Sequence, residues 1–127
     1  MKSILIIEDD VLVGKTLRSH LAKKGFDITL VEEGAEGIRK FQEISPDVVI
    51  LDIRLPDING IEVLKKIKEE PKKTTIVVMT AFDDMQTTVE AIKSGAFEYL
   101  VKPLNYVELD LTIDKALQVQ ALEEKVS

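Results

Sequence analysis

The sequence predicts a three-layer α/β domain, in which one β-sheet lies between two layers of helices. Short apolar runs rich in Val and Ile alternate along the chain with longer stretches in which apolar residues recur at helical spacing. Glycines mark the joints between these segments. With right-handed crossovers, this alternation produces a parallel sheet, and 127 residues are enough for one such domain.

Five apolar runs are expected to be strands: residues 4–7, 28–31, 48–51, 76–79 and 97–101. The first, third and fourth runs are continuous, as expected for strands that are covered on both faces. The second and fifth alternate between apolar and polar residues, which is typical of edge strands with one wetter face.

Five helices are expected between and after these runs, because apolar residues recur there three or four positions apart. The sets are Val13, Leu17 and Leu21; Ala35, Ile38 and Phe41; Ile61, Leu64 and Ile67; Met85, Val89 and Ile92; and Leu109, Ile113 and Ala116. Asn105 is placed to cap the last helix, which is expected over about residues 105–125.

The composition excludes several classes of function. The chain has 17 basic and 23 acidic residues, and this net charge of −6 disfavours direct binding to nucleic acid or an anionic membrane. The absence of cysteine excludes disulfides and thiolate chemistry. No apolar run approaches the roughly twenty residues of a spanning helix, and the start carries no cleavable signal. We therefore expect a cytoplasmic protein, or a domain of one.

Polar residues follow the predicted strands at their carboxyl ends. Glu8 and Asp9 follow the first run, Asp52 the third, Thr80 the fourth and Lys102 the fifth. In a parallel sheet these ends share one edge, where ligands bind at the point of reversal in strand order. The side chains converge there if the first and third strands are neighbours. Taken singly, each residue is better explained as a turn former, a helix cap or a solvated charge. The whole set, with each member at the end of a different strand, favours a functional site.

The charge of this cluster favours a bound cation. Two like charges about 4 Å apart cost roughly 4 kcal/mol at an effective dielectric near 20, and Lys102 can offset only part of that. Because all the candidate ligands are oxygen atoms, a hard ion such as Mg²⁺ fits best. A phosphoryl group could then approach Asp52, with the cation, Lys102 and Thr80 stabilising its oxygens.

At these residues the chain resembles the receiver domains of the response-regulator family of two-component signalling. The motifs that carry the resemblance are Ile7-Glu8-Asp9-Asp10, Leu51-Asp52-Ile53-Arg54-Leu55-Pro56 with Gly60, Met79-Thr80-Ala81 and Val101-Lys102-Pro103. The resemblance implies one receiver domain over residues 1–127, with a doubly wound, flavodoxin-like sheet in strand order 2-1-3-4-5 and five helices. It also implies a regulatory domain, not a conventional enzyme, that catalyses only its own phosphorylation and dephosphorylation.

The resemblance further implies the roles of the acidic residues. Asp52 would accept a phosphoryl group from a sensor histidine kinase. Asp9, Asp52 and the backbone carbonyl of Arg54 would bind Mg²⁺ or Mn²⁺ directly, and Glu8 would help through water. The family more often has Asp where this chain has Glu8, so the role of this longer side chain stays open.

Other residues match the conserved frame and the switch of the family. Lys102 would pair with the phosphate, and the bond between Lys102 and Pro103 is expected to be cis. Pro56 and Gly60 match structural positions. Thr80 and Tyr99 match the switch pair, which would reshape the face formed by the fourth helix, the fifth strand and the fifth helix. That face or the last helix is a candidate for homodimerisation.

The kind of output is suggested by two features. Residues 95–104 resemble the receivers of sigma-54-dependent transcription activators, in which an ATPase and a DNA-binding domain follow the receiver. Val119, Leu122 and Val126 are spaced like a coiled-coil seam, so the last helix is expected to lead into a linker to further domains. The alternative is a helix end that lies on its own domain.

Two other functions compete with this hypothesis. The chain could be a stand-alone receiver that acts through protein–protein interaction. It could also be a Mg²⁺-dependent phosphatase with an Asp nucleophile, although such an enzyme needs a second Asp two residues later, where Arg54 stands. His20 is expected to face solvent, and the five strands argue against a helical phosphohistidine domain.

Overall fold

The computed structural model describes residues 1–71, 74–81 and 85–126. Its five parallel strands are β1 (Ser3–Ile7), β2 (Asp27–Val31), β3 (Val48–Asp52), β4 (Thr75–Thr80) and β5 (Glu98–Val101). They form one sheet in the order β2-β1-β3-β4-β5, which confirms the predicted fold class and topology. The helices are α1 (Val11–Lys23), α2 (Gly34–Ile44), α3 (Gly60–Lys68), α4 (Met85–Lys93) and α5 (Tyr106–Val126).

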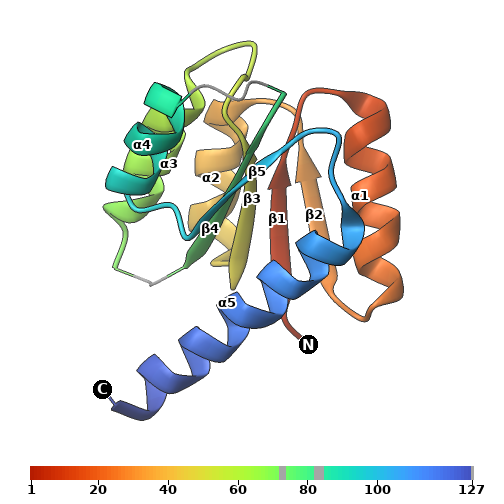
Figure 1. The fold of residues 1–127 in the computed structure, drawn as a ribbon, viewed down its shortest axis with the longest axis vertical. Helices are drawn as coiled ribbons and strands as arrows, with labels where there is room; N and C mark the ends of the chain where they lie inside the picture. The colour runs from red at the N-terminus through yellow and green to blue at the C-terminus, as the bar shows by residue number, and fades with distance from the viewer. Residues whose placement is uncertain (72–73, 82–84, 127) are drawn as a thin grey trace.

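Helices cover both faces of the sheet, with α1 and α5 on one face and α2, α3 and α4 on the other (Figure 1). Each face has its own hydrophobic core. Leu17, Leu21 and Ile113 belong to the core under α1 and α5. Phe41 and Leu64 belong to the core under α2 and α3. The sheet is therefore sealed on both sides, and its ends are where polar chemistry can lie.

The central strands are the continuous apolar runs of the sequence. β1, β3 and β4 are almost entirely buried, whereas most of β2 and β5 is only partly buried. The edge positions of β2 and β5 are thereby confirmed. In β5 the buried residue is Leu100, at 4% exposure, while Val101 is 41% exposed. The alternating set through Phe97, Tyr99 and Val101 is thus the less buried side of this strand.

Helix α4 lies where the sequence predicts it, but its apolar stripe does not face the core. Met85, Val89 and Ile92 are 76%, 41% and 47% exposed, and the buried residue of α4 is Ala91. The physical reason is the position of α4 beside β5, the short strand at the sheet edge. The small Ala91 allows close approach there, and the large apolar side chains remain in solvent.

Helix α5 packs on the sheet over most of its length and then leaves it. Leu109 and Ala116 are fully buried, and the Asn105 side chain accepts a hydrogen bond from the Glu108 amide at 3.0 Å, which confirms the predicted cap. Gln120 is 8% exposed and Leu122 is 62% exposed. The C-terminal end of α5 projects past the sheet (Figure 1). The side chain of Val126 lies outside the described part of the chain, so the predicted seam stays a prediction.

The helices of the described residues differ from membrane-spanning helices. None of them combines the length and the apolar character that crossing a membrane requires.

Candidate functional site: an acidic pocket at the carboxyl edge of the sheet

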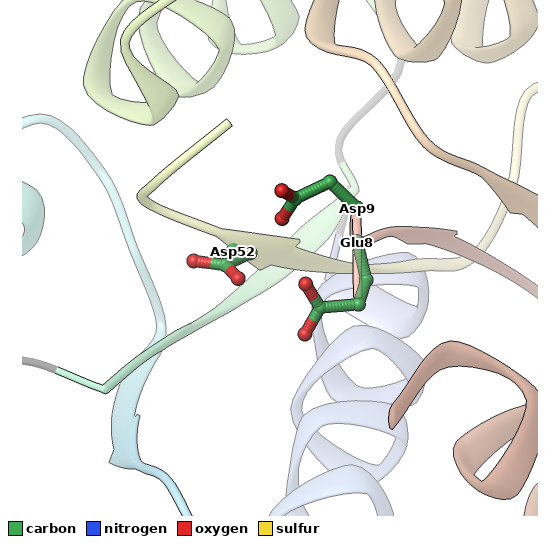
Figure 2. Close-up of side chains that lie close together, drawn as sticks. All are labelled: Glu8, Asp9 and Asp52. Carbon is green, nitrogen blue, oxygen red and sulfur yellow. The ribbon is translucent and has the colours of Figure 1, made fainter. Parts of the chain in front are cut away.

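Two neighbouring strands deliver the acidic residues to one place. β1 pairs with β3, so that Ile7 lies beside Leu51. Glu8 and Asp9 therefore leave β1 next to Asp52, the last residue of β3. Figure 2 shows the three carboxylates grouped at this edge, and one oxygen of each lies within 4.8 Å of the others. The convergence predicted from the sequence is thus present for these three residues.

Lys102 reaches the same carboxylates from β5, on the far side of β4. Its ammonium donates to Asp52 Oδ2 at 2.7 Å and also to Glu8 Oε1. The Lys102 side chain is only 16% exposed. The peptide bond between Lys102 and Pro103 is cis. One cation therefore bridges two buried carboxylates that come from different strands.

The backbone after β3 holds Asp52 in place. Asp52 Oδ1 accepts a hydrogen bond from the Arg54 amide at 2.8 Å. The amide of Gly60, the first residue of α3, donates to the Ile53 carbonyl at 2.8 Å. A Cβ atom at Gly60 would lie 2.4 Å from the Ile53 Cα, so only glycine permits this close approach. Pro56 is exposed in the loop between β3 and α3.

The same loop contains a helix cap that the sequence analysis missed. The Asp57 carboxylate accepts hydrogen bonds from the Gly34 and Ala35 amides, at 2.8 and 2.9 Å, at the start of α2. The hydrogen bond from Ala35, reinforced by that from Gly34, holds the pKa of Asp57 below its ordinary value. A cap from 23 residues away leaves no local motif, so sequence spacing could not have shown it.

Burial and like charge make the pocket electrostatically unsatisfied. Burial, with a hydrogen bond to Asp52 acting in the same direction, raises the pKa of Glu8 to about 7, although Lys102 opposes the change. Burial lowers the pKa of Lys102, but the hydrogen bonds to Asp52 and Glu8 outweigh it, and the net shift is upward. The carboxylates thus hold the lysine in its charged form, and further positive charge would let Glu8 ionise.

The donor set fits a hard divalent cation. It consists of carboxylate oxygens alone, which suits Mg²⁺ or Mn²⁺. Asp9 is exposed, and its carboxylate forms no hydrogen bond or ion pair with any described residue. Asp9 can therefore turn toward an ion without breaking an existing contact.

Thr80 and Tyr99 lie on the two strands next to the pocket. Thr80, the last residue of β4, is fully buried, and its carbonyl accepts a hydrogen bond from the Lys102 amide at 2.7 Å. Asp52 pairs with Met79, so Thr80 lies one residue beyond it at the same edge. Tyr99 in β5 is partly buried and packs against the core under α2 and α3.

The expectation that His20 faces solvent is wrong. Its side chain is 25% exposed, and its Nε2 lies 2.9 Å from Asp110 Oδ1. Its ring stacks on Tyr106 with 4.5 Å between the ring centroids. Lys24 also pairs with Asp110, at 3.1 Å. His20 faces α5, which crosses beside α1, and the helical pattern of α1 alone could not reveal this neighbour.

Fold and site together define a class of protein: an α/β domain with an acidic cluster around a strand-end aspartate, whose oxygen atoms could hold a cation. The model of the response regulator receiver domain matches residues 4–114. The chain belongs to this family, as the sequence motifs predicted.

Known relatives and structures agree with this assignment. The chain is 37% identical over 123 residues to the regulatory protein AtoC of Escherichia coli, covering 97% of this chain and 27% of the relative. It is 38% identical to the transcriptional regulatory protein ZraR of Klebsiella oxytoca, again covering 27% of that protein. The chain thus spans about a quarter of the length of these relatives.

Solved structures show the same fold. A CheY-like receiver domain from Methanospirillum hungatei superposes with a TM-score of 0.93 at 27% identity, covering 97% of this chain and 98% of that one. A two-component response regulator from Clostridium difficile superposes with a TM-score of 0.89 at 33% identity, covering 93% and 97%.

Proposed function

We propose that this chain is a phosphorylation-driven switch, in which Asp52 accepts a phosphoryl group from a sensor histidine kinase. The observation that carries the proposal is the environment of Asp52. Asp52 is 4% exposed and ends a central strand, and its carboxylate lies between an ammonium group and two further carboxylates. Family membership supports the same role.

The transfer needs no oxidant and no net proton. An Asp52 oxygen forms a bond to phosphorus while the bond between phosphorus and the kinase imidazole nitrogen breaks. The electron pair of the broken bond stays on that nitrogen. Because Arg54 and Lys102 each donate to a different oxygen of Asp52, the carboxylate is oriented before the donor arrives.

Asp9, Asp52 and the backbone carbonyl of Arg54 would hold Mg²⁺ or Mn²⁺ directly, with Glu8 nearby through water. The bound cation would supply positive charge to the phosphoryl oxygens. Lys102 would move from the carboxylate to the phosphoryl group and Thr80 would donate to it, so these chain groups share the added negative charge.

The output surface in this proposal is the face of α4, β5 and α5. Phosphorylation would draw Thr80 toward Asp52, Tyr99 would turn inward, and this face would change shape. Its chemistry supports such a role, because Met85, Val89 and Ile92 of α4 expose apolar side chains beside Val101 of β5. This surface, or the projecting end of α5, would form the homodimer contact.

The downstream partner would be an effector that controls transcription. The likeness to AtoC and ZraR supports this, because both are named as regulatory proteins and both are longer than this chain. The resemblance of residues 95–104 to receivers of sigma-54-dependent activators points to that kind of promoter control. A kinase and a transcription machinery as partners place the protein in the cytoplasm.

The experiment is incubation with acetyl phosphate and Mg²⁺, followed by intact-mass analysis. We expect one added phosphoryl group on the wild-type chain, none on Asp52→Asn, and none when EDTA removes the metal. Labelling that survives in Asp52→Asn would overturn the proposal.

A further inference from the structure

Helix α2 begins without a cap of its own. Its N-cap residue is Glu33, whose extended backbone suits a cap, but the Glu33 side chain forms no capping hydrogen bond. The Gly34 and Ala35 amides donate instead to the two carboxylate oxygens of Asp57, at 2.8 and 2.9 Å. Because Asp57 lies between β3 and α3, the start of α2 and this loop hold each other in place.

The same loop carries groups of the proposed phosphorylation site. Asp52 ends β3, and the Arg54 amide donates to Asp52 Oδ1 at 2.8 Å. Arg54 and Asn59 form an antiparallel β-bridge, which closes the loop into a short hairpin with Asp57 near its tip. A contact that fixes the tip therefore limits the movement of Arg54, whose carbonyl is a proposed ligand of the cation.

Apolar packing and a backbone hydrogen bond extend this connection to the loop after β1. A Cβ atom at Gly34 would lie 2.6 Å from Ile58 Cγ1, so the residue next to Asp57 packs directly on the first turn of α2. The Glu8 amide donates to the carbonyl of Val31, the last residue of β2, at 3.0 Å. The segment between β2 and α2 thus joins the loop after β1 to the loop after β3.

We propose that Asp57 is a positioning residue for the cation site: its carboxylate clamps the loop after β3 to the start of α2, and so holds Asp52 and Arg54 in register with the loop after β1. This inference rests on the proposed binding of Mg²⁺ at these residues. Because both carboxylate oxygens of Asp57 accept from α2 amides, this residue acts through the loop and touches neither the cation nor the phosphoryl group.

A cap supplied by α2 itself separates this role from simple helix capping. Glu36 stands three residues after Glu33, so the substitution Glu33→Ser would complete a capping box. In such a box the serine hydroxyl accepts from a helix amide, and the glutamate reaches back to the N-cap amide. The double variant Glu33→Ser with Asp57→Ala therefore regains a capped helix but not the clamp, whereas Asp57→Ala alone lacks both.

The first measurement is amide hydrogen exchange in metal-free protein, followed by NMR. We expect the Arg54 amide to exchange several-fold faster in Asp57→Ala, because the loop that carries it is no longer held. The double variant should recover most of the stability in urea that Asp57→Ala loses, but its Arg54 amide should still exchange fast. An Arg54 amide that exchanges as in wild type, in either variant, overturns the inference.

The second measurement is the Mg²⁺ affinity, by calorimetry. We expect Asp57→Ala and the double variant to bind Mg²⁺ about fivefold more weakly than wild type, less than the roughly tenfold that loss of a group bonded directly to a ligand costs. Wild-type affinity in Asp57→Ala, or affinity that returns together with stability in the double variant, overturns the inference, because Asp57 would then be a helix cap and nothing more.

The matched control for lost stability is Gln120→Leu. It removes hydrogen bonds to the Asp47 carbonyl and the Thr75 hydroxyl, which lie at the opposite edge of the sheet. We expect Gln120→Leu to be destabilised and yet to bind Mg²⁺ as wild type does. If it loses as much affinity as Asp57→Ala, weakened binding follows from lost stability alone, and the inference is overturned.

Two safeguards keep these outcomes distinct. If Asp57→Ala does not fold, Asp57→Asn takes its place, because its amide keeps the size of the side chain but offers one acceptor oxygen in place of two. If wild-type protein binds no Mg²⁺ and gains no phosphoryl group, the proposed function fails. The exchange of the Arg54 amide still decides whether Asp57 positions the loop, because it is measured without metal or phosphodonor.

Discussion

The two ends of the β-sheet show opposite ways of placing polar groups in a protein interior. At the carboxyl edge, Glu8 and Asp52 are buried beside one lysine, with Asp9 close by. The raised pKa of Glu8, about 7, shows that burial and its neighbours disfavour its charge. The carboxylates at this edge thus carry more negative charge than the one lysine neutralises.

At the amino edge, Gln120 and Thr74 place neutral donors opposite neutral acceptors. The Gln120 side chain of α5 donates to the Asp47 carbonyl at 2.6 Å and to Thr75 Oγ1 at 2.7 Å. The Thr74 hydroxyl donates to the Pro46 carbonyl at 2.8 Å. These contacts tie α5 to the starts of β3 and β4, just before the helix leaves the sheet.

The difference teaches which end of the molecule is built to change. A cation or a phosphoryl group can alter the energy of the charged edge by several kcal/mol, because like charges there are close and poorly solvated. The hydrogen bonds of Gln120 and Thr74 at the amino edge involve no charged group. The sheet therefore carries a responsive end and a fixed end, and α5 is anchored at the fixed one.

The largest expected effect concerns the charge of Glu8 at the responsive end, which the substitution Glu8→Gln removes. In metal-free protein, the pKa of Glu8 is raised in the folded state to about 7 from an ordinary value near 4.5. Folding is therefore favoured by the protonated form, and this contribution is lost as pH rises from about 4.5 through 7. We expect the free energy of unfolding of wild type, relative to Glu8→Gln, to fall by about 2 kcal/mol between pH 5 and pH 8.

Urea denaturation in EDTA at both pH values checks this effect. Taking the difference from Glu8→Gln cancels the pH dependence that both proteins share. Mg²⁺ should reduce the difference, because the cation stabilises the ionised Glu8. A difference that stays constant from pH 5 to pH 8 would contradict the electrostatic description of this edge.

The sequence was sufficient to predict the responsive end, but not the fixed one. Glu8 and Asp52 follow continuous apolar runs and Lys102 follows an alternating one. The rule for parallel sheets places the residues after such strands at one edge. Gln120 interrupts no pattern: it lies in a helix rich in polar residues, and its partners are a backbone carbonyl and a hydroxyl from other elements. Such contacts depend on how α5 crosses the sheet, which hydrophobic periodicity does not encode.

The apolar stripe of α4 is a second case in which hydrophobic periodicity alone does not predict the contacts of a helix. The helical spacing of Met85, Val89 and Ile92 correctly predicted a helix, but periodicity cannot tell a core face from a face that awaits a partner. Only the position of α4 beside the edge strand β5 decides that these side chains are exposed.

The second prediction tests the fixed end. We expect Gln120→Leu to lower the free energy of unfolding by roughly 1–2 kcal/mol, because the Thr75 hydroxyl and the Asp47 carbonyl lose a buried donor. Gln118→Leu, on the exposed side of the same helix, is the matched control and should change stability by less than about 0.5 kcal/mol. Urea denaturation at pH 5 and pH 8 should give the same loss at both. A loss of stability that differs between pH 5 and pH 8 would contradict the proposed difference between the two ends of the sheet.

The smallest effect sharpens the comparison within the responsive end, because Asp57 is a carboxylate whose charge is favoured there. It caps α2 through the Gly34 and Ala35 amides, and the hydrogen bond from Ala35 in particular lowers its pKa. We expect Asp57→Ala to cost about 1 kcal/mol at pH 7, the ordinary value of such a cap. Since the folded pKa of Asp57 is lowered, the contribution of the cap to stability is present above pH 4 and is lost as pH falls through the folded value. The sign is therefore opposite to that of Glu8.

Thermal unfolding at pH 7 and pH 3 measures this contribution, with Asp114→Ala on the exposed side of α5 as control. If Asp57→Ala cost as much at pH 3 as at pH 7, the carboxylate would be acting through packing, not through its charge on the helix amides.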